Sequence, residues 1–314
     1  MYIPKYIKAY ESGVLEERIK LAYNILKRCT LCPRNCKVNR LKGERGMCDT
    51  LELPIISDYF AHFGEEAPLV GRYGSGTIFI SCCSLLCMYC QNYEISHLGQ
   101  GEVTSIERFS DMMISLQKRN CHNINIVTPT HVVPQLLKAL KLAVEKGLHI
   151  PLVYNTGGYE KLDTLKLLDG IVDIYMPDFK YWDPEMARRY SNAYDYPDIA
   201  RRAIKEMHRQ VGELRINEEG IAEGGLLIRH LVLPNKVAGT REIVRFIAEE
   251  ISPNTYVNIM AQYRPCGLAD RDDLINRGIT RKEYIEAVES ALNAGLKRLD
   301  KSNIMLYKSL IGES

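Results

Sequence analysis

The sequence lacks a strong excess of charge of either sign: its 314 residues include 41 Lys or Arg and 39 Asp or Glu, for a net charge of +2. Binding to nucleic acid or to an anionic membrane through a broad basic surface would require a larger imbalance. No apolar run approaches the ~18 residues that span a bilayer, and no secretory signal pattern or low-complexity tract is present. We therefore expect a cytoplasmic protein with no nucleic-acid partner and no membrane partner.

The chain is 46% hydrophobic, which is enough for a substantial core, and it contains ten cysteines at short spacings. In a reducing compartment such cysteines are expected to be thiols that bind metal rather than disulfides.

Cys83, Cys87 and Cys90 have three and then two residues between them. Three thiolates at this spacing can bind three irons of a [4Fe–4S] cubane and leave the fourth iron open, whereas electron-transfer cubanes use four cysteines. The spacing therefore indicates a cluster that binds a further ligand. The alternative is a set of buried apolar cysteines, or one half of a zinc site.

The sequence around these cysteines resembles the signature of the radical SAM superfamily. Gly-Ser-Gly-Thr-Ile-Phe-Ile-Ser precedes the triad and Gln-Asn-Tyr-Glu-Ile-Ser follows it, which is similar to the PflX type, related to pyruvate formate-lyase activating enzymes. The resemblance extends from Cys29 to about Pro265. Two positions depart from it, because Cys82 stands where Gly is frequent and Ser84 where Asn is frequent. Only Cys83 gives the three-residue gap to Cys87.

From Gly76 onward, strand-like and helix-like patterns alternate, which favours parallel strands joined by right-handed crossovers. The predicted fold class is α/β: a partial (β/α)6 TIM-like barrel over residues 71–314 with an N-terminal Cys-rich extension over residues 1–70. Strands are expected at residues 77–81, 123–128, 151–155, 172–176, 226–232 and 256–260. Helices are expected at residues 15–28, 106–119, 133–145, 161–168, 199–210, 241–250 and 281–296, with a hairpin within 213–223 and a last edge strand at 303–307.

A second group of thiols, Cys29, Cys32, Cys36 and Cys48, falls within a 20-residue window of the N-terminal extension. Four thiolates can bind one tetrahedral Zn²⁺ or all four irons of a second cubane, and either centre could be a structural knot or an electron relay. Basic residues surround the group and would offset its charge, although a solvated basic loop is an alternative.

In parallel barrels, functional side chains collect where the strands end. Polar residues follow each predicted strand, and the candidates for binding a cofactor are Tyr89, Thr128, His131, Asn155, Asp178, Lys180 and Arg229. Lys180 or Arg229 can supply the cation that a carboxylate requires, and at i, i+2 spacing Asp178 faces the same way as Lys180. The resemblance implies that Asp178-Phe-Lys180 contacts the methionyl part of S-adenosylmethionine (SAM). The family's Gly-Gly-Glu after the second strand is absent, and residues 128–131 take its place.

The resemblance implies an oxidoreductase that cleaves SAM reductively at a [4Fe–4S] cluster on Cys83, Cys87 and Cys90, forming a 5′-deoxyadenosyl radical that removes a substrate hydrogen. The implied partners are SAM, a ferredoxin or flavodoxin as electron donor, and a glycyl radical enzyme as substrate. A radical SAM enzyme that acts on a small molecule or peptide, a two-cluster electron-transfer protein and a zinc-dependent binding module are the alternatives.

Overall fold

The computed structural model describes residues 2–312. Its centre is one open sheet in the order β10-β9-β8-β6-β5-β4-β2-β1-β3, in which every pair from β2 to β10 is parallel and β1 is antiparallel to both β2 and β3. The strands are β1 Ile55–His62, β2 Ser75–Ile80, β3 Glu102–Val103, β4 Ile124–Val127, β5 Leu152–Thr156, β6 Ile174–Pro177, β7 Arg215–Ile216, β8 Ala222–Leu231, β9 Tyr256–Met260 and β10 Arg298–Leu299.

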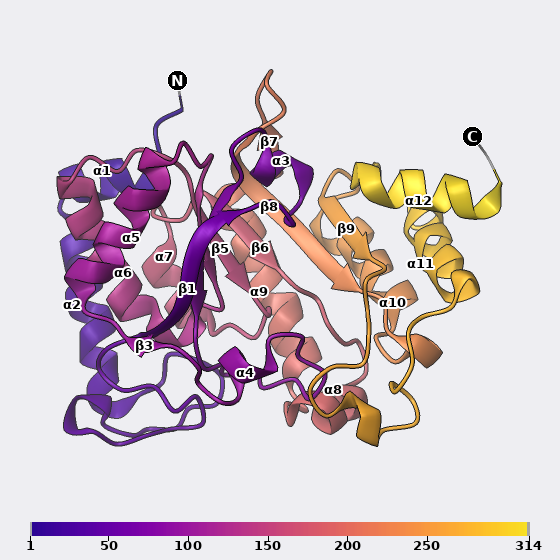
Figure 1. Cartoon of the computed structure of the whole chain (residues 1–314), viewed down its shortest axis with the longest axis horizontal. Helices are drawn as coiled ribbons and strands as arrows, with labels where there is room; N and C mark the ends of the chain where they lie inside the picture. Colours follow the sequence, from indigo (N-terminus) through magenta and orange to yellow (C-terminus); the bar gives the residue numbers. More distant parts are fainter. Residues whose placement is uncertain (1, 313–314) are drawn as a thin grey trace.

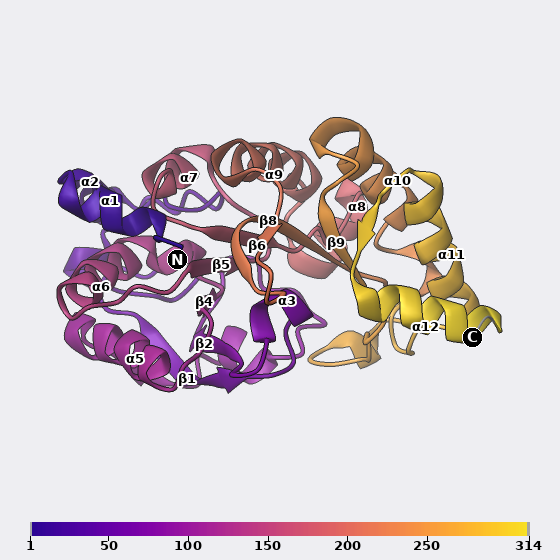
Figure 2. The ribbon, with the colours of Figure 1, turned by 90° about the horizontal axis from the view of Figure 1, so that it is seen from above.

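Helices surround the outer face of this sheet, and Figure 2 shows α5, α6, α7 and α9 in an arc outside the strands. Between residues 2 and 312 none of the helices is both long and apolar enough to cross a membrane. The helices are α1 Lys5–Glu11, α2 Val14–Ile25, α3 Ala67–Val70, α4 Tyr93–Ser96, α5 Ile106–Lys118, α6 Val133–Glu145, α7 Leu162–Leu168, α8 Pro184–Ser191, α9 Tyr196–Val211, α10 Thr240–Phe246, α11 Arg281–Asn293 and α12 Lys301–Ile311.

The predicted fold class is confirmed. The six predicted strands are β2, β4, β5, β6, β8 and β9, and they lie side by side in chain order as a parallel, unclosed sheet. The predicted hairpin is also present, because β7 pairs antiparallel with the first residues of β8.

The predicted last strand at residues 303–307 is wrong, because these residues lie within α12. Asp300 caps this helix by accepting a hydrogen bond from the Ser302 N–H. The side chain of Asn303 then bonds the backbone N–H and C=O of Ile259 in β9, which holds the first turn of the helix against this strand. A short apolar run does not distinguish a strand from a helix by periodicity alone.

The two faces of the sheet bury different residues, as the period-2 alternation of a strand requires. Ile126 and Ile228 belong to the large apolar core under the outer helices. Val153, Met176 and Leu227 face the other way and pack with Leu69 of α3, which covers part of the inner face. The core therefore lies on both sides of the strands, and the open end of the inner face is left for a site.

The N-terminal residues are built into this architecture. Helices α1 and α2 pack against α6, and β1 extends the sheet beside β2 (Figure 1). Buried Asp173, just before β6, accepts hydrogen bonds from the Tyr2 hydroxyl at 2.7 Å and from the Lys5 N–H at 2.8 Å, which attaches the start of α1 to the sheet. The division of the chain at residue 70 stays a prediction.

Candidate active site

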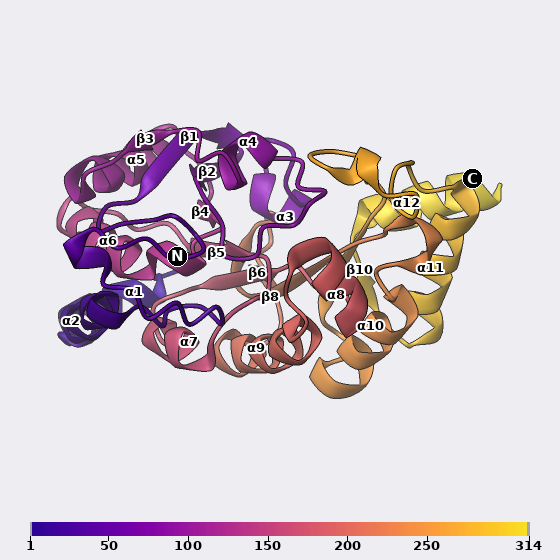
Figure 3. The ribbon, with the colours of Figure 1, turned by 90° about the horizontal axis from the view of Figure 1, so that it is seen from below.

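A cavity of about 330 Å³ lies at the carboxyl ends of the parallel strands. Figure 3 views the molecule from this end, where α4 and α8 also lie. Each of the six central strands contributes to its lining, as the barrel prediction requires: Cys83 after β2, Thr128 after β4, Asn155 in β5, Asp178 after β6, Arg229 in β8 and Gln262 after β9. This volume falls within the ~300–1,000 Å³ of small-molecule sites.

The loop after β2 brings all three cysteines of the triad to this cavity. The Leu85 N–H donates to Cys83 Sγ at 3.3 Å, and the Ser191 hydroxyl donates to Cys87 Sγ at 3.1 Å. Leu86 has φ +56°, a left-handed conformation that is unfavourable for a bulky residue and recurs at functional sites. The loop thus wraps around the thiols, and each of these two sulfurs has a hydrogen-bond donor.

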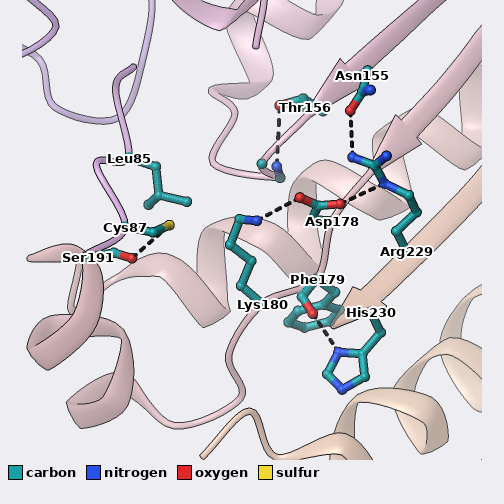
Figure 4. Close-up of polar contacts among 12 residues, drawn as sticks. Leu85, Cys87, Asn155, Thr156, Asp178, Phe179, Lys180, Ser191, Arg229 and His230 are labelled. Atoms are coloured by element: carbon teal, nitrogen blue, oxygen red, sulfur yellow. Dashed lines mark hydrogen bonds and ion pairs between the residues drawn. The ribbon is translucent and has the colours of Figure 1, made fainter. Parts of the chain in front are cut away.

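Lys180 lies between Cys87 of the triad and the half-buried carboxylate of Asp178 (Figure 4). Its Nζ donates to Asp178 Oδ2 at 2.6 Å. Burial would lower the pKa of Lys180, but the charge of Asp178 and then that of Cys87 raise it well above its usual value. A cation that lies close to both groups can bind the carboxylate of a ligand and can offset the charge of a ligated thiolate.

Arg229 occupies the other side of Asp178. Its Nε donates to Asp178 Oδ1 at 2.9 Å, and its two terminal nitrogens donate to Glu65 Oε2 at 3.2 Å and to Asn155 Oδ1 at 2.7 Å. Burial would raise the pKa of Asp178, yet Arg229 and Lys180 outweigh it and hold this pKa below its usual value. Because its donors are committed to protein oxygens, Arg229 fixes Asp178 in place, and Lys180 is the better candidate for an incoming carboxylate.

His230, next in sequence to Arg229, faces the opposite side of β8. Its Nδ1 donates to the Phe179 carbonyl oxygen at 2.7 Å, and its Nε2 accepts from the Thr240 hydroxyl of α10 at 2.8 Å. Burial lowers the pKa of His230 to about 4. The alternation of the strand predicts this arrangement, with Arg229 inward and His230 towards a helix.

Glu160 is a buried acid behind the cavity wall that the sequence analysis missed. Thr130 and Thr156, which line the cavity, both donate to its Oε1, the former at 2.5 Å, and the Tyr154 hydroxyl donates to its Oε2 at 3.3 Å. Burial raises the pKa of Glu160 to about 7. One signal was available, because Glu160 closes the run Gly157-Gly-Tyr-Glu160 directly after β5.

Thr128, the first residue after β4, has φ +61°, which is unusual for a β-branched residue. Glycine adopts such a conformation without cost, whereas a threonine is strained in it. Tyr89 lines the cavity beside the triad, and Glu65 does so as well, although the sequence analysis did not select Glu65.

His131 is placed apart from the other predicted cofactor residues. It lines a second, smaller cavity together with Cys29, Cys32, Cys36 and Cys48. The residues that the sequence predicts to bind a cofactor or metal therefore lie at two sites, one at the strand ends and one among the N-terminal residues.

The donor set at the strand ends fits an iron–sulfur cluster. All ten cysteines are free thiols, and burial raises the pKa of Cys83 to about 12, so this thiol would exchange its proton for a metal rather than ionise alone. Within residues 2–312 no group of three or more His, Cys, Asp or Glu side chains is arranged to hold a single metal ion. A cubane has a different requirement, because each thiolate bonds its own iron atom.

Comparisons with known proteins identify relatives of the chain. No protein-family model matches it. The uncharacterized protein MJ0674 of Methanocaldococcus jannaschii is 34% identical over 288 residues, a match that covers 89% of this chain and 78% of that protein. The uncharacterized protein MJ0808 of the same organism is 27% identical over 157 residues, covering 45% of this chain and 46% of that protein. Among solved structures, methylornithine synthase (PylB) matches 74% of this chain and 68% of its own with a TM-score of 0.46 and 14% identity. By the extent of the first match, the chain belongs to the same protein family as MJ0674 of M. jannaschii.

Proposed function

We propose that this protein is a radical SAM enzyme. The observation that carries the proposal is the placement of Cys83, Cys87 and Cys90 in one cavity with the half-buried ion pair of Lys180 and Asp178. Three thiols leave one iron of a cubane open to a further ligand. The lysine and the carboxylate beside them can bind the carboxylate and the amine of SAM.

When bound by the three thiols, the cluster would supply one electron to the sulfonium of SAM, whose cleavage releases methionine and a 5′-deoxyadenosyl radical that removes a hydrogen atom from the substrate. Lys180 would bind the carboxylate of SAM, and Asp178 would accept a hydrogen bond from its amine. Arg229 holds Asp178 in position from behind. The apolar wall formed by Leu85, Leu231 and Met260 would keep water away from the reacting carbon.

The substrate class follows only from resemblance, which favours the glycine Cα of a partner protein. Abstraction from a small molecule or a peptide is the competing subtype, since fold and cofactor do not fix the substrate. Incubation of the reduced, SAM-loaded protein with a candidate glycyl radical enzyme, followed by EPR, separates the two. A glycyl radical signal on the partner supports activation, and its absence together with turnover of a small molecule supports the other subtype.

The core of the proposal is tested by anaerobic reconstitution with iron and sulfide, followed by reduction in the presence of SAM. We expect methionine and 5′-deoxyadenosine from the native protein, and neither from the variant with Cys83, Cys87 and Cys90 replaced by Ala. Cys121→Ala is the control, because Cys121 is a buried free thiol that lies outside the cavity. If the triple variant still made 5′-deoxyadenosine, the assignment of the cluster would be wrong. A reconstituted protein that binds no SAM would instead indicate an electron carrier.

A further inference from the structure

Four thiols of the N-terminal residues enclose a cavity of their own. Cys29, Cys32, Cys36 and Cys48 all line it. Two backbone hydrogen bonds join Cys29 to the segment that follows Cys36. The Cys29 N–H donates to the Val38 carbonyl oxygen and the Lys37 N–H donates to the Cys29 carbonyl oxygen, both at 2.8 Å. Thiols from two ends of a loop are thus held around one space without forming a disulfide.

Hydrogen-bond donors are directed at these sulfurs. The Met47 N–H donates to Cys36 Sγ at 3.3 Å. A backbone hydrogen bond from Arg34 also reaches the thiol of Cys32. Backbone N–H groups aimed at sulfur stabilise a thiolate that is bound to metal and tune the potential of a cluster.

A buried cation lies beside the same cavity. Arg40 is only 2% exposed, and its guanidinium donates to the carbonyl oxygens of Leu51 and His131 at 2.6–3.0 Å. These partners are neutral carbonyl oxygens, and a buried charge is costly unless it is paired. Ligated thiolates would supply negative charge in the cavity that Arg40 lines together with Cys48.

His131 is a second buried residue at this cavity. It is 1% exposed, and its Nε2 donates to the Ser81 carbonyl oxygen at 3.0 Å. This bond leaves Nδ1 with a lone pair, and Nδ1 has no hydrogen-bond partner among the described residues. His131 lines the cavity of the four cysteines, so its ring would lie against a group bound there.

We propose that Cys29, Cys32, Cys36 and Cys48 hold a second iron–sulfur cluster, whose charge is balanced by Arg40 and which is contacted by His131. Four cysteines close all four irons, which is the pattern of an electron-transfer cluster rather than of one that binds a further ligand. Within residues 2–312 these thiols line one cavity and are not arranged to hold a single metal ion, whereas a cubane needs each thiolate at its own iron.

The position of this site gives the second cluster a use, and this part rests on the proposed function. Ser81, which accepts the hydrogen bond from His131, lies two residues before Cys83 of the triad. Arg34, between Cys32 and Cys36, donates to the carbonyl oxygens of Ser84 and Leu85 within the triad loop. The second cluster would accept one electron from a reduced iron–sulfur or flavin protein and pass one electron to the cluster on the triad, returning to its starting state.

The experiment uses the variant with Cys83, Cys87 and Cys90 replaced by Ala, reconstituted anaerobically with ferrous iron and sulfide and freed of excess metal. We expect about four irons and four sulfides per chain and an EPR signal on reduction. Further replacement of Cys36, the most accessible of the four thiols by its place in the loop, with Ser should remove most of this iron, whereas Cys121→Ala should retain it. In the same background, His131→Gln should leave the iron content unchanged and shift the reduction potential or the EPR signal.

Because metal content is measured without SAM, this result does not depend on the radical chemistry. About one zinc per chain that blocks iron uptake would overturn the proposal, and so would the absence of any bound metal. A cluster whose potential and spectrum do not respond to His131→Gln would overturn the contact with His131. If the second cluster is present but full-length protein lacking it is reduced by a natural donor as fast as the native protein, the relay role is wrong.

Discussion

The guanidinium of Arg34 donates from Nε to the carbonyl oxygen of Ser84 at 2.9 Å. This bond joins the loop of the N-terminal cysteines to the loop that carries Cys83 and Cys87. The same guanidinium reaches the carbonyl oxygens of Leu85 at 3.1 Å and Ser191 at 2.7 Å. One side chain therefore supports the triad loop at several points.

Removal of this support should weaken the triad cluster. Arg34→Ala leaves these carbonyl oxygens without their donor, and we expect the cluster on the triad to be lost several-fold faster to an iron chelator. Arg34→Lys should not restore stability, because one ammonium cannot reproduce a planar fork of donors. The rate at which the visible absorbance of the cluster bleaches measures this loss. Lys37→Ala, in the same loop, is the control. Equal rates for Arg34→Ala and the native protein would contradict the supporting role.

Lys180 should bind the carboxylate of SAM. Lys180→Ala removes a charge-assisted hydrogen bond, so SAM affinity should fall by about 1.5–3 kcal/mol while the iron content stays unchanged. Calorimetry on the reconstituted protein measures this loss. The exposed Lys166, replaced by Ala, is the control. An unchanged affinity in both Lys180→Ala and Asp178→Ala would remove the proposed SAM site.

Arg229 should act mainly through the structure that it holds together. Arg229→Ala removes the arginine that binds half-buried Glu65 and leaves Asp178 with Lys180 as its cation. Loss of hydrogen bonds between charged groups costs about 1.5–3 kcal/mol each. We expect urea unfolding to show this loss and the double variant with Glu65→Gln to recover part of it. The absence of recovery would mean that Glu65 does not contribute to the cluster of charges.

Glu160 should make the stability of the protein depend on pH. Its pKa is raised from 4.5 to about 7 by burial, so the folded state binds the proton more tightly than the unfolded chain does. The favourable contribution is therefore complete below pH ~4.5 and is lost as the pH rises through ~7. Glu160→Gln keeps an acceptor for Thr130 but does not titrate.

Urea unfolding of the native protein and of Glu160→Gln at pH 5 and pH 8 tests this prediction. Between these two values, the native protein should lose about 1–3 kcal/mol relative to the variant, since one pKa unit corresponds to ~1.4 kcal/mol. Parallel pH profiles for the two proteins would show that Glu160 does not ionise in this range.

Cys82 should prove to be a structural residue and not a ligand. It is buried and has φ +68°, a conformation that costs a residue with a Cβ roughly 1–2 kcal/mol. Cys82→Gly should therefore be more stable than Cys82→Ala by about that amount, and both variants should retain the triad cluster. Iron analysis and urea unfolding check the two parts, and loss of iron in either variant would assign Cys82 as a ligand.

The sequence alone determined those features that lie close together along the chain. The triad from Cys83 to Cys90 spans one loop, so its spacing is visible without a fold. The alternation of strand and helix patterns was sufficient for the parallel sheet, because each pattern reflects local periodicity. It also placed Asp178, Lys180 and Arg229 at strand ends, which meet at one edge in any parallel barrel.

Tertiary structure decided what depends on contacts between distant residues. Arg229 meets Glu65, which is 164 positions away, and Arg34 meets Ser191, which is 157 positions away, and no local pattern predicts either pair. His131 was assigned to the strand-end site by its position after β4, yet its bond to Ser81 places it at the second cavity. A side chain's partners depend on which elements pack around it, and only the folded chain specifies these.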